Sequence, residues 1–141
     1  MKVLDVNVVL AAFRKDHPQF ETARRWLEGL ARSGEPFAVT EAVAGSFVRL
    51  VTNRRAFANP TPIEDAFAYL RAVRDQPSHV LLAPGPRHLE LFERLCRRGD
   101  ASGDLVPDGQ LAAVAVEHGA EGGSFDRDFA RFEGLRWSRP D

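Results

Sequence analysis

Residues 1–10 read MKVLDVNVVL, an almost unbroken apolar run that is rich in β-branched side chains. Such a run is typical of a buried strand in a parallel sheet that helices cover on both faces. Asp5 interrupts the run, so we expect it at the carboxyl end of this strand, just before a short helix near Asn7. In open α/β sheets ligands bind in the crevice outside the strand ends. Asp5 is therefore either the N-cap of that helix or part of a binding site.

Further acids occupy similar junctions later in the chain. Glu41 follows a short expected strand at 36–39, Asp108 lies in the first turn of a late helix, and Asp126 and Asp128 follow a weak strand near 120–124. Each acid alone is typical of a helix N-terminus, where the helix dipole favours negative charge by about 0.3–1 kcal/mol. If the strands are parallel, however, all these junctions lie along one edge of the sheet. The acids are then expected to converge on a single crevice.

The rest of the chain alternates between segments with the apolar spacing of a helix and short apolar runs that are typical of strands. Apolar residues at helical spacing predict helices within 20–31, 41–51, 63–75, 88–96 and 107–118, and short apolar runs predict strands at 36–39, 80–83, 120–124 and 135–137. We expect an exposed loop at 99–104. This alternation predicts an α/β fold with a mostly parallel central sheet between layers of helices.

Composition limits the class of protein. A chain of 141 residues fits one domain, 1–141, and no apolar stretch approaches the roughly 18 residues of a membrane span. We find no signal peptide and expect a cytoplasmic protein. Cys96 is the only cysteine, which excludes an internal disulfide and a cysteine-based zinc site. The net charge is −1, but all 19 basic residues except Lys2 and Lys15 are arginines, whose planar fork suits phosphate contacts.

Converging carboxylates have an electrostatic consequence. Two unit charges about 4 Å apart repel by about 4 kcal/mol at an effective dielectric of 20. Three or four carboxylates in one crevice therefore require either protonation or a divalent cation. Hard oxygen ligands without histidine or cysteine suit Mg²⁺ or Mn²⁺ and not zinc. Such an ion can activate water for phosphodiester hydrolysis.

The acidic landmarks and their neighbours resemble a known family. Asp5-Val6-Asn7, Glu41, the segment 106–108 (VPD) and the segment 124–129 (SFDRDF) are similar in order and spacing to those of PIN-domain ribonucleases, and above all to VapC toxins of bacterial type II toxin–antitoxin modules. The resemblance implies a PIN-like three-layer α/β/α sandwich. It also implies a Mg²⁺- or Mn²⁺-dependent endoribonuclease whose catalytic and metal-binding acids are Asp5, Glu41, Asp108 and Asp126.

The same resemblance implies other site residues and partners. Asn7 and Ser124 match polar positions that line such sites, and either Asp126 or Asp128 is the fourth acid. An RNA substrate, a homodimer and a cognate VapB-type antitoxin whose tail occupies the active-site groove are also implied. Three positions depart from the family pattern: glycine at 122–123 where large apolar residues are expected, Phe125 in place of a small hydroxyl residue, and Gly109 in a helical first turn.

Two other functions are open to this sequence. An aspartyl-phosphate phosphatase of the haloacid-dehalogenase type also uses an acid after the first strand, but it needs a second acid where this chain has Asn7. A non-catalytic module that binds RNA or a partner protein is the second alternative, although pure binding of phosphate has no use for clustered acids. The four histidines are scattered and form no metal-binding motif.

Overall fold

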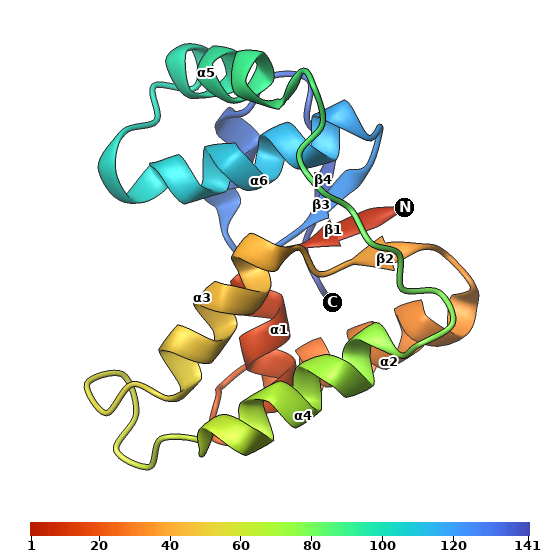
Figure 1. Cartoon of the computed structure of the whole chain (residues 1–141), viewed down its shortest axis with the longest axis vertical. Coiled ribbons are helices and arrows are strands. Elements are labelled where there is room, and N and C mark those ends of the chain that lie inside the picture. Colours follow the sequence, from red (N-terminus) through yellow and green to blue (C-terminus); the bar gives the residue numbers. More distant parts are fainter.

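The computed structural model describes residues 1–141 and contains one parallel sheet of four strands. The strands are β1 (Lys2–Leu4), β2 (Phe37–Ala38), β3 (Glu121–Gly123) and β4 (Trp137–Ser138), in the spatial order β2-β1-β3-β4 (Figure 1). Lys2 of β1 is in register with Phe37 of β2 and with Glu121 of β3. The first strand is thus central, as the apolar run at the N-terminus predicts.

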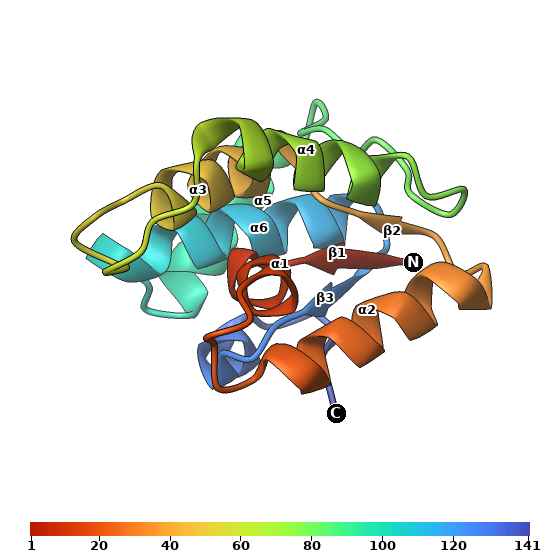
Figure 2. The same cartoon turned by 90° about the horizontal axis from the view of Figure 1, so that it is seen from below.

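Helices cover both faces of this sheet. They are α1 (Val6–Phe13), α2 (Phe20–Ser33), α3 (Glu41–Val51), α4 (Ile63–Arg74), α5 (His88–Arg98) and α6 (Val106–Glu117), with short 3-10 helices at Gly103–Leu105 and Arg127–Arg131. Helices α5 and α6 lie on one side of the sheet, and α1 to α4 lie on the other (Figures 1 and 2). The expected three-layer α/β/α sandwich is confirmed. None of the helices combines the length and apolar character that a membrane crossing requires.

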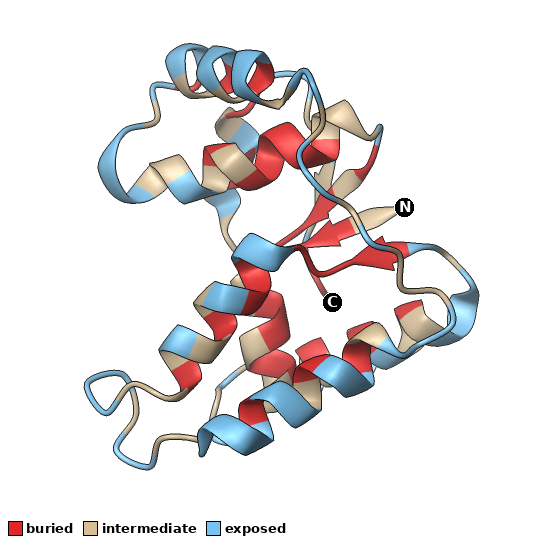
Figure 3. Cartoon of the chain, in the orientation of Figure 1, coloured by how far each residue is buried: buried red, intermediate tan, exposed pale blue.

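Burial follows from this layering. Val3 and Leu4 of β1 are completely buried, as are Phe37 of β2 and Phe47 of α3. Figure 3 shows buried residues on the strands and on the sides of the helices that face them, with exposed residues on the outer surfaces. A central strand that is covered on both faces cannot alternate apolar and polar residues, which explains the continuous apolar run of the sequence.

One expected strand is wrong. Residues 80–83 form no strand, and only an isolated bridge joins Phe37 to His79. The pairing ends because the next N–H along the edge of β2, that of Val39, has a side-chain acceptor. It donates to Nε2 of the His79 imidazole (3.0 Å) and not to a backbone carbonyl. Backbone pairing therefore stops after one bridge. The segment that follows runs on as irregular chain toward α5.

Two of the unusual glycines are explained by close packing. A Cβ at Gly109 would collide with Sγ of Cys96, so glycine there leaves room for the Cys96 side chain where α5 packs against α6. A Cβ at Gly123 would lie 3.0 Å from the Trp26 ring and 3.2 Å from the Leu4 side chain. The large apolar group that this part of the core needs is supplied by Trp26 of α2. The glycine in β3 is therefore matched by a large side chain from another element.

The strand order also fixes where a crevice opens. From β1 the chain goes to β2 on one side, whereas β3 lies on the other side of β1. Such a reversal of direction leaves a crevice at the carboxyl ends of the central strands. Asp5 directly follows β1, Ser124 directly follows β3, and Thr40 caps α3 just after β2.

Candidate active site

Asp5 is both a helix cap and a buried acid of the crevice. The residue is 7 % exposed, and its Oδ1 accepts a 2.7 Å hydrogen bond from the N–H of Val6, the first residue of α1. The sequence predicts Asp5 either as a helix N-cap or as part of a binding site, and these two roles are therefore compatible. Capping fixes one carboxylate oxygen, and the other oxygen is directed toward groups that come from the end of β3.

A hydrogen-bond network joins the ends of β1 and β3 around Asp5. The Ser124 hydroxyl donates to Oδ2 of Asp5 (2.7 Å), and the Asn7 side-chain amide donates to the same oxygen (2.9 Å) and to the Ser124 oxygen (3.0 Å). The backbone N–H of Asp126 also donates to the Ser124 hydroxyl (2.9 Å), and that of Phe125 donates to Oδ1 of Asn7 (3.1 Å). Ser124 is completely buried. The network therefore holds Asp5 in one position, and it makes Asn7 and Ser124 the immediate support of this acid.

Asp108 reaches the same crevice from the first turn of α6. Burial raises its pKa to about 7, and repulsion from Asp5, Asp126 and Asp128 contributes to the rise, while Arg131 acts in the opposite direction. Burial also raises the pKa of Asp5, against hydrogen bonds from Ser124 and Val6, and the charge of Asp126 adds to that rise. Acids that are far apart in the sequence therefore lie close enough to shift one another's pKa values.

Asp126 and Asp128 differ in their surroundings. Asp126 is the N-cap of the 3-10 helix Arg127–Arg131, and its Oδ1 accepts from the N–H of Asp128 (2.8 Å). Its charge acts on both Asp5 and Asp108. The Asp128 carboxylate acts on Asp108 and lies 3.4 Å from the Arg131 guanidinium. Asp126 is thus the acid more closely associated with Asp5.

Glu41 lies on the wall of the crevice but apart from the other acids. Its carboxylate forms a 2.7 Å ion pair with Arg74 of α4, and its side chain is 82 % exposed. Arg74 also donates to the carbonyl oxygen of Val39 (3.0 Å), which fixes the guanidinium next to the end of β2. Glu41 therefore already has a cationic partner, unlike Asp5 and Asp108.

The acids open into a cleft of about 340 Å³ between α3, α6 and the segment before α5. Asp5 and Asp108 line it together, which brings segments far apart in the sequence to one cavity. No lysine, arginine or histidine lines this cleft. The remaining lining residues are Val6, Thr40, Glu41, Ala42, Val43, Ser46, Leu82, Ala83, Pro84, Pro107, Gln110, Leu111 and Val114.

Sequence reasoning missed several residues of this region. Arg131 was detectable, because it lies three residues after Asp128 in a helical turn and such pairs meet on one face. Arg74 was not, because its pairing with Glu41 depends on how α4 packs against the end of β2. Gln110 lines the cleft two residues after Asp108, and nothing in its local sequence distinguishes it from a solvent-facing helical residue.

The donor chemistry fits a hard divalent cation. No three His, Cys, Asp or Glu side chains of residues 1–141 stand close enough together to hold a metal ion by themselves. Mg²⁺, however, is commonly bound through one or two carboxylates, with waters and substrate oxygens completing its shell. Asp5 and Asp108 could supply those two carboxylates, and a cation bound there would favour their ionised forms against the burial and the nearby negative charge that raise their pKa values.

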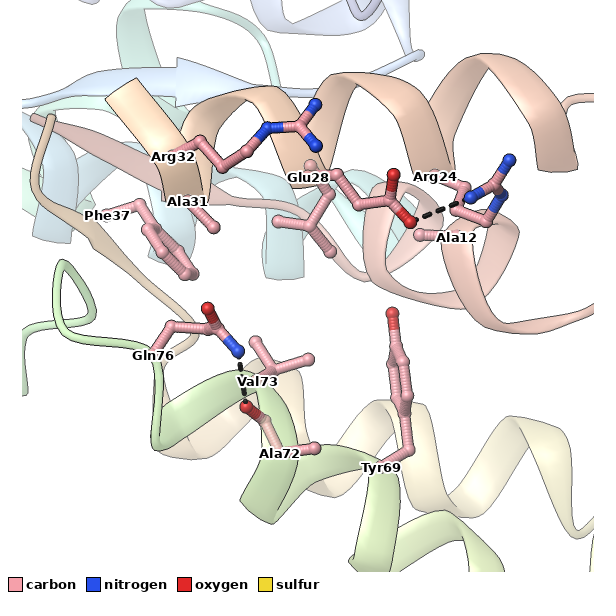
Figure 4. A pocket seen from close by; sticks show the side chains of 11 residues that line it. Ala12, Arg24, Glu28, Ala31, Arg32, Phe37, Tyr69, Ala72, Val73 and Gln76 are labelled. Carbon is pink, nitrogen blue, oxygen red and sulfur yellow. Dashed lines mark hydrogen bonds and ion pairs between the residues drawn. The ribbon is translucent and has the colours of Figure 1, made fainter. Parts of the chain in front are cut away.

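A second cavity of about 380 Å³ lies between α2 and α4 and has a different character (Figure 4). Tyr69 projects from α4 toward α2, and burial raises the pKa of its hydroxyl. The only acid, Glu28, is paired with Arg24 at 2.8 Å. This cavity therefore lacks the unpaired acids of the first. Its other lining residues are Ala12, Leu27, Ala31, Arg32, Phe37, Ala72, Val73 and Gln76.

Comparison with known proteins identifies the family. The PIN domain family model matches residues 2–135, nearly the whole chain. The chain is a PIN-domain protein. This PIN domain is 53 % identical over 140 residues to ribonuclease VapC25 of Mycobacterium tuberculosis and 52 % identical to ribonuclease VapC31 of the same species, in each case over 99 % of both chains. It therefore belongs, within the PIN-domain proteins, to the VapC ribonucleases.

Solved structures support the same fold. The PIN domain superposes on a chain of the VapBC2 structure from Rickettsia felis, bound to a promoter DNA fragment, with a TM-score of 0.74, 17 % identity and coverage of 99 % and 98 % of the two chains. It also superposes on VapC20 of Mycobacterium tuberculosis, a toxin that cleaves the sarcin-ricin loop, with a TM-score of 0.67, 20 % identity and coverage of 96 % and 99 %. At these identities the similarity establishes the fold.

Proposed function

We propose that this VapC ribonuclease is a Mg²⁺- or Mn²⁺-dependent endoribonuclease, the toxin of a type II toxin–antitoxin module, and that it hydrolyses RNA phosphodiester bonds. The observation that carries the proposal is the meeting of Asp5 and Asp108 in one cleft, each with a raised pKa and neither with a cationic partner in that cleft. The naming of its close relatives as ribonucleases supports the reaction class.

The acids alone would repel an RNA phosphate, so the proposed activity requires a cation. When bound, Mg²⁺ or Mn²⁺ would supply positive charge for the phosphate and would acidify a water for attack on phosphorus. Hydrolysis adds that water across the phosphorus–oxygen bond, giving one phosphate end and one hydroxyl end. We assign Asp5 and Asp108 to holding the cation, and Asp126, whose charge acts on both of them, and Glu41, at the cleft wall, to supporting roles.

The remaining residues of the site have positioning roles in this proposal. Ser124 and Asn7 hold Asp5 through hydrogen bonds of 2.7 Å and 2.9 Å, so the carboxylate needs little rearrangement when a cation arrives. Arg131 keeps Asp128 partly neutralised from outside the cleft. Hydrogen bonds that orient a metal ligand commonly affect metal affinity and activity. We therefore expect the loss of the bonds from Ser124 or Asn7 to weaken cation binding by Asp5.

We also propose the partners that the family suggests. Similar solved structures contain VapB-type antitoxins together with the toxin, so a VapB-type antitoxin is the proposed inhibitor of this chain. A homodimer and a cytoplasmic location remain predictions. RNA affinity is expected to fall as salt rises, because arginine–phosphate contacts release counterions from the nucleic acid.

The two alternative functions are less well supported. A phosphatase of the haloacid-dehalogenase type needs a carboxyl group two residues after Asp5, but Asn7 occupies that position and donates its amide to Asp5. A binding module would gain nothing from two acids that burial and mutual repulsion make costly to ionise. Cation-assisted hydrolysis, in contrast, uses both acids, because a bound cation compensates for their negative charges.

The proposal is tested by incubating the purified protein with total RNA and mapping new 5′ ends. We expect discrete ends with Mg²⁺ and none with EDTA or with Asp5→Asn. Asp65→Asn, on the exposed first turn of α4, is the matched control and is expected to cleave like the wild type. Cleavage that survives both EDTA and Asp5→Asn would contradict the proposal.

A further inference from the structure

The acid cleft has an apolar half that the proposed chemistry does not use. Along α6, both Asp108 and Val114 line the cleft. Six residues of helix correspond to about 9 Å, so the cleft extends well beyond the acids. In that direction its lining is mostly aliphatic, from the segment before α5 and from α6: Leu82, Ala83, Pro84, Leu111 and Val114.

The wall at 82–84 is irregular chain, yet it is firmly anchored. The Glu117 carboxylate at the end of α6 accepts hydrogen bonds from the N–H groups of Gly85 (2.8 Å) and Arg87 (2.9 Å). Nε2 of His118 lies 2.8 Å from the Ala83 carbonyl oxygen, to which it donates. These contacts tie the segment to the same helix that carries Asp108. The apolar half is therefore preformed and does not depend on a ligand to assemble it.

The lining determines what can occupy this space. The cleft contains three acids and no basic side chain, so a phosphate or another anion is excluded from its apolar half. Its volume of about 340 Å³ is near the lower end of the roughly 300–1,000 Å³ that small-molecule sites occupy. Gln110 and Ser46 add two neutral polar side chains to the lining. The fitting ligand is a neutral, flat, largely apolar group with hydrogen-bonding atoms on its edge.

We propose that this half of the cleft is a nucleobase pocket, which receives an unpaired base of the RNA next to the phosphodiester at the acids. The inference rests on the proposed ribonuclease function and adds a determinant of substrate choice. Leu82 and Pro84, which are less buried than Leu111 and Val114, contact the ring, and Gln110 reads the edge through its amide, which can both donate and accept hydrogen bonds.

Binding of small probes tests the pocket independently of cleavage. AMP, GMP, CMP and UMP are titrated against the protein in Mg²⁺ and compared with ribose 5-phosphate, which has the same phosphate but no base. We expect at least one nucleotide to bind roughly tenfold more tightly than ribose 5-phosphate, which is what contacts to a single base commonly contribute. Equal binding of all five probes would overturn the pocket, as would no nucleotide binding at millimolar concentration.

Variants of the lining residues test whether the base binds in this half of the cleft. Ala42 is exposed and lines the cleft, so Ala42→Phe fills the cavity without disturbing the core, and it should abolish the advantage of the nucleotide over ribose 5-phosphate. Leu82→Ala should reduce that advantage, whereas Leu89→Ala, at a side chain 76 % exposed and outside the cleft, should not. Gln110→Leu should change the order of preference among the four bases. A full base-dependent advantage in Ala42→Phe would place the base elsewhere and overturn the proposal.

The two proposals fail in different ways. If the protein cleaves RNA with Mg²⁺ but binds nucleotides no better than ribose 5-phosphate, the pocket is wrong and the ribonuclease function stands. If base-dependent binding is lost in Ala42→Phe but no RNA is cleaved, the ribonuclease function is wrong and the pocket survives as a nucleotide site.

Discussion

The hydroxyl of Ser124 donates a 2.7 Å hydrogen bond to Oδ2 of Asp5 and so links residues 119 positions apart in the chain. The serine is completely buried, and its oxygen also accepts from the side chain of Asn7 and the backbone of Asp126. This single hydroxyl therefore connects the first acid of the proposed site to the segment that carries the last. The site depends on the sheet, because the bond requires β1 and β3 to be neighbours.

Ser124→Ala tests that connection. The variant removes a donor to the buried Asp5 carboxylate and the acceptor of the Asp126 N–H, which costs about 1–3 kcal/mol of stability. It also removes a bond that lowers the pKa of Asp5, so that pKa should rise further and the ionised carboxylate should become rarer. We expect cleavage to need more Mg²⁺, with the largest change in mildly acidic buffer. Ser33→Ala, at an exposed serine of α2, is the control, and an equal Mg²⁺ requirement in both variants would contradict the role of Ser124.

The raised pKa of Asp108 predicts how stability depends on pH without metal. This carboxyl has a pKa of about 7 in the folded protein and its ordinary value of 3.8 when unfolded. Between these two pH values the folded state binds more protons than the unfolded state. Protonation of Asp108 therefore stabilises the fold fully below about pH 4, and this stabilisation is lost as the pH rises through about 7. His79, whose pKa burial lowers, has the opposite sign. Comparison with Asp108→Asn therefore isolates the carboxyl.

The measurement is thermal unfolding in EDTA across this pH range. Relative to Asp108→Asn, the wild type should lose melting temperature between mildly acidic and neutral pH. Mg²⁺ should restore more stability at the neutral end, because only the ionised carboxylate binds it. Parallel curves for the two proteins would show that Asp108 titrates normally.

Gly123 and Trp26 offer a test of packing. Gly123→Val should destabilise the protein by about 1–3 kcal/mol, because its side chain would enter space that the Trp26 ring and Leu4 already fill. In the double variant Gly123→Val with Trp26→Leu, part of this loss should be recovered, which chemical denaturation can measure. Additive losses in the two single variants would show that the residues do not compete for the same space.

These residues also show how far the sequence predicts the structure. The position of Asp5 after a buried strand, and the convergence of Asp108 and the segment after β3, follow from strand burial and parallel topology, which are local patterns combined with a general rule. The strand expected at 80–83 was wrong because a histidine side chain replaces the backbone partner of Val39. Gly109 and Gly123 were unexplained because their reasons, Cys96 and Trp26, lie on other elements. Contacts between side chains that are far apart in the sequence leave no periodic pattern in it.

Glu41 provides a contrast within the site. Its ion pair with Arg74 is largely solvated at the carboxylate, so Glu41→Gln should change stability by less than about 1 kcal/mol. Because Arg74 already balances its charge, Glu41→Gln should also reduce kcat/KM for RNA cleavage less than Asp5→Asn does. Arg74→Ala should lower the melting temperature more than Glu41→Gln, since the Val39 carbonyl oxygen loses a donor. A larger loss of activity in Glu41→Gln than in Asp5→Asn would contradict this ranking.

The central claim is that Asp5 and Asp108, which are far apart in the sequence, form one cation site. Its most direct test is anomalous diffraction from crystals soaked in Mn²⁺ at about pH 8, above the pKa of Asp108. The account predicts a Mn²⁺ peak in the cleft with carboxylate oxygens of both residues as ligands, and loss of that peak in Asp108→Asn. Crystals whose Mn²⁺ lies outside this cleft, or whose cleft remains without a peak at saturating Mn²⁺, would contradict it.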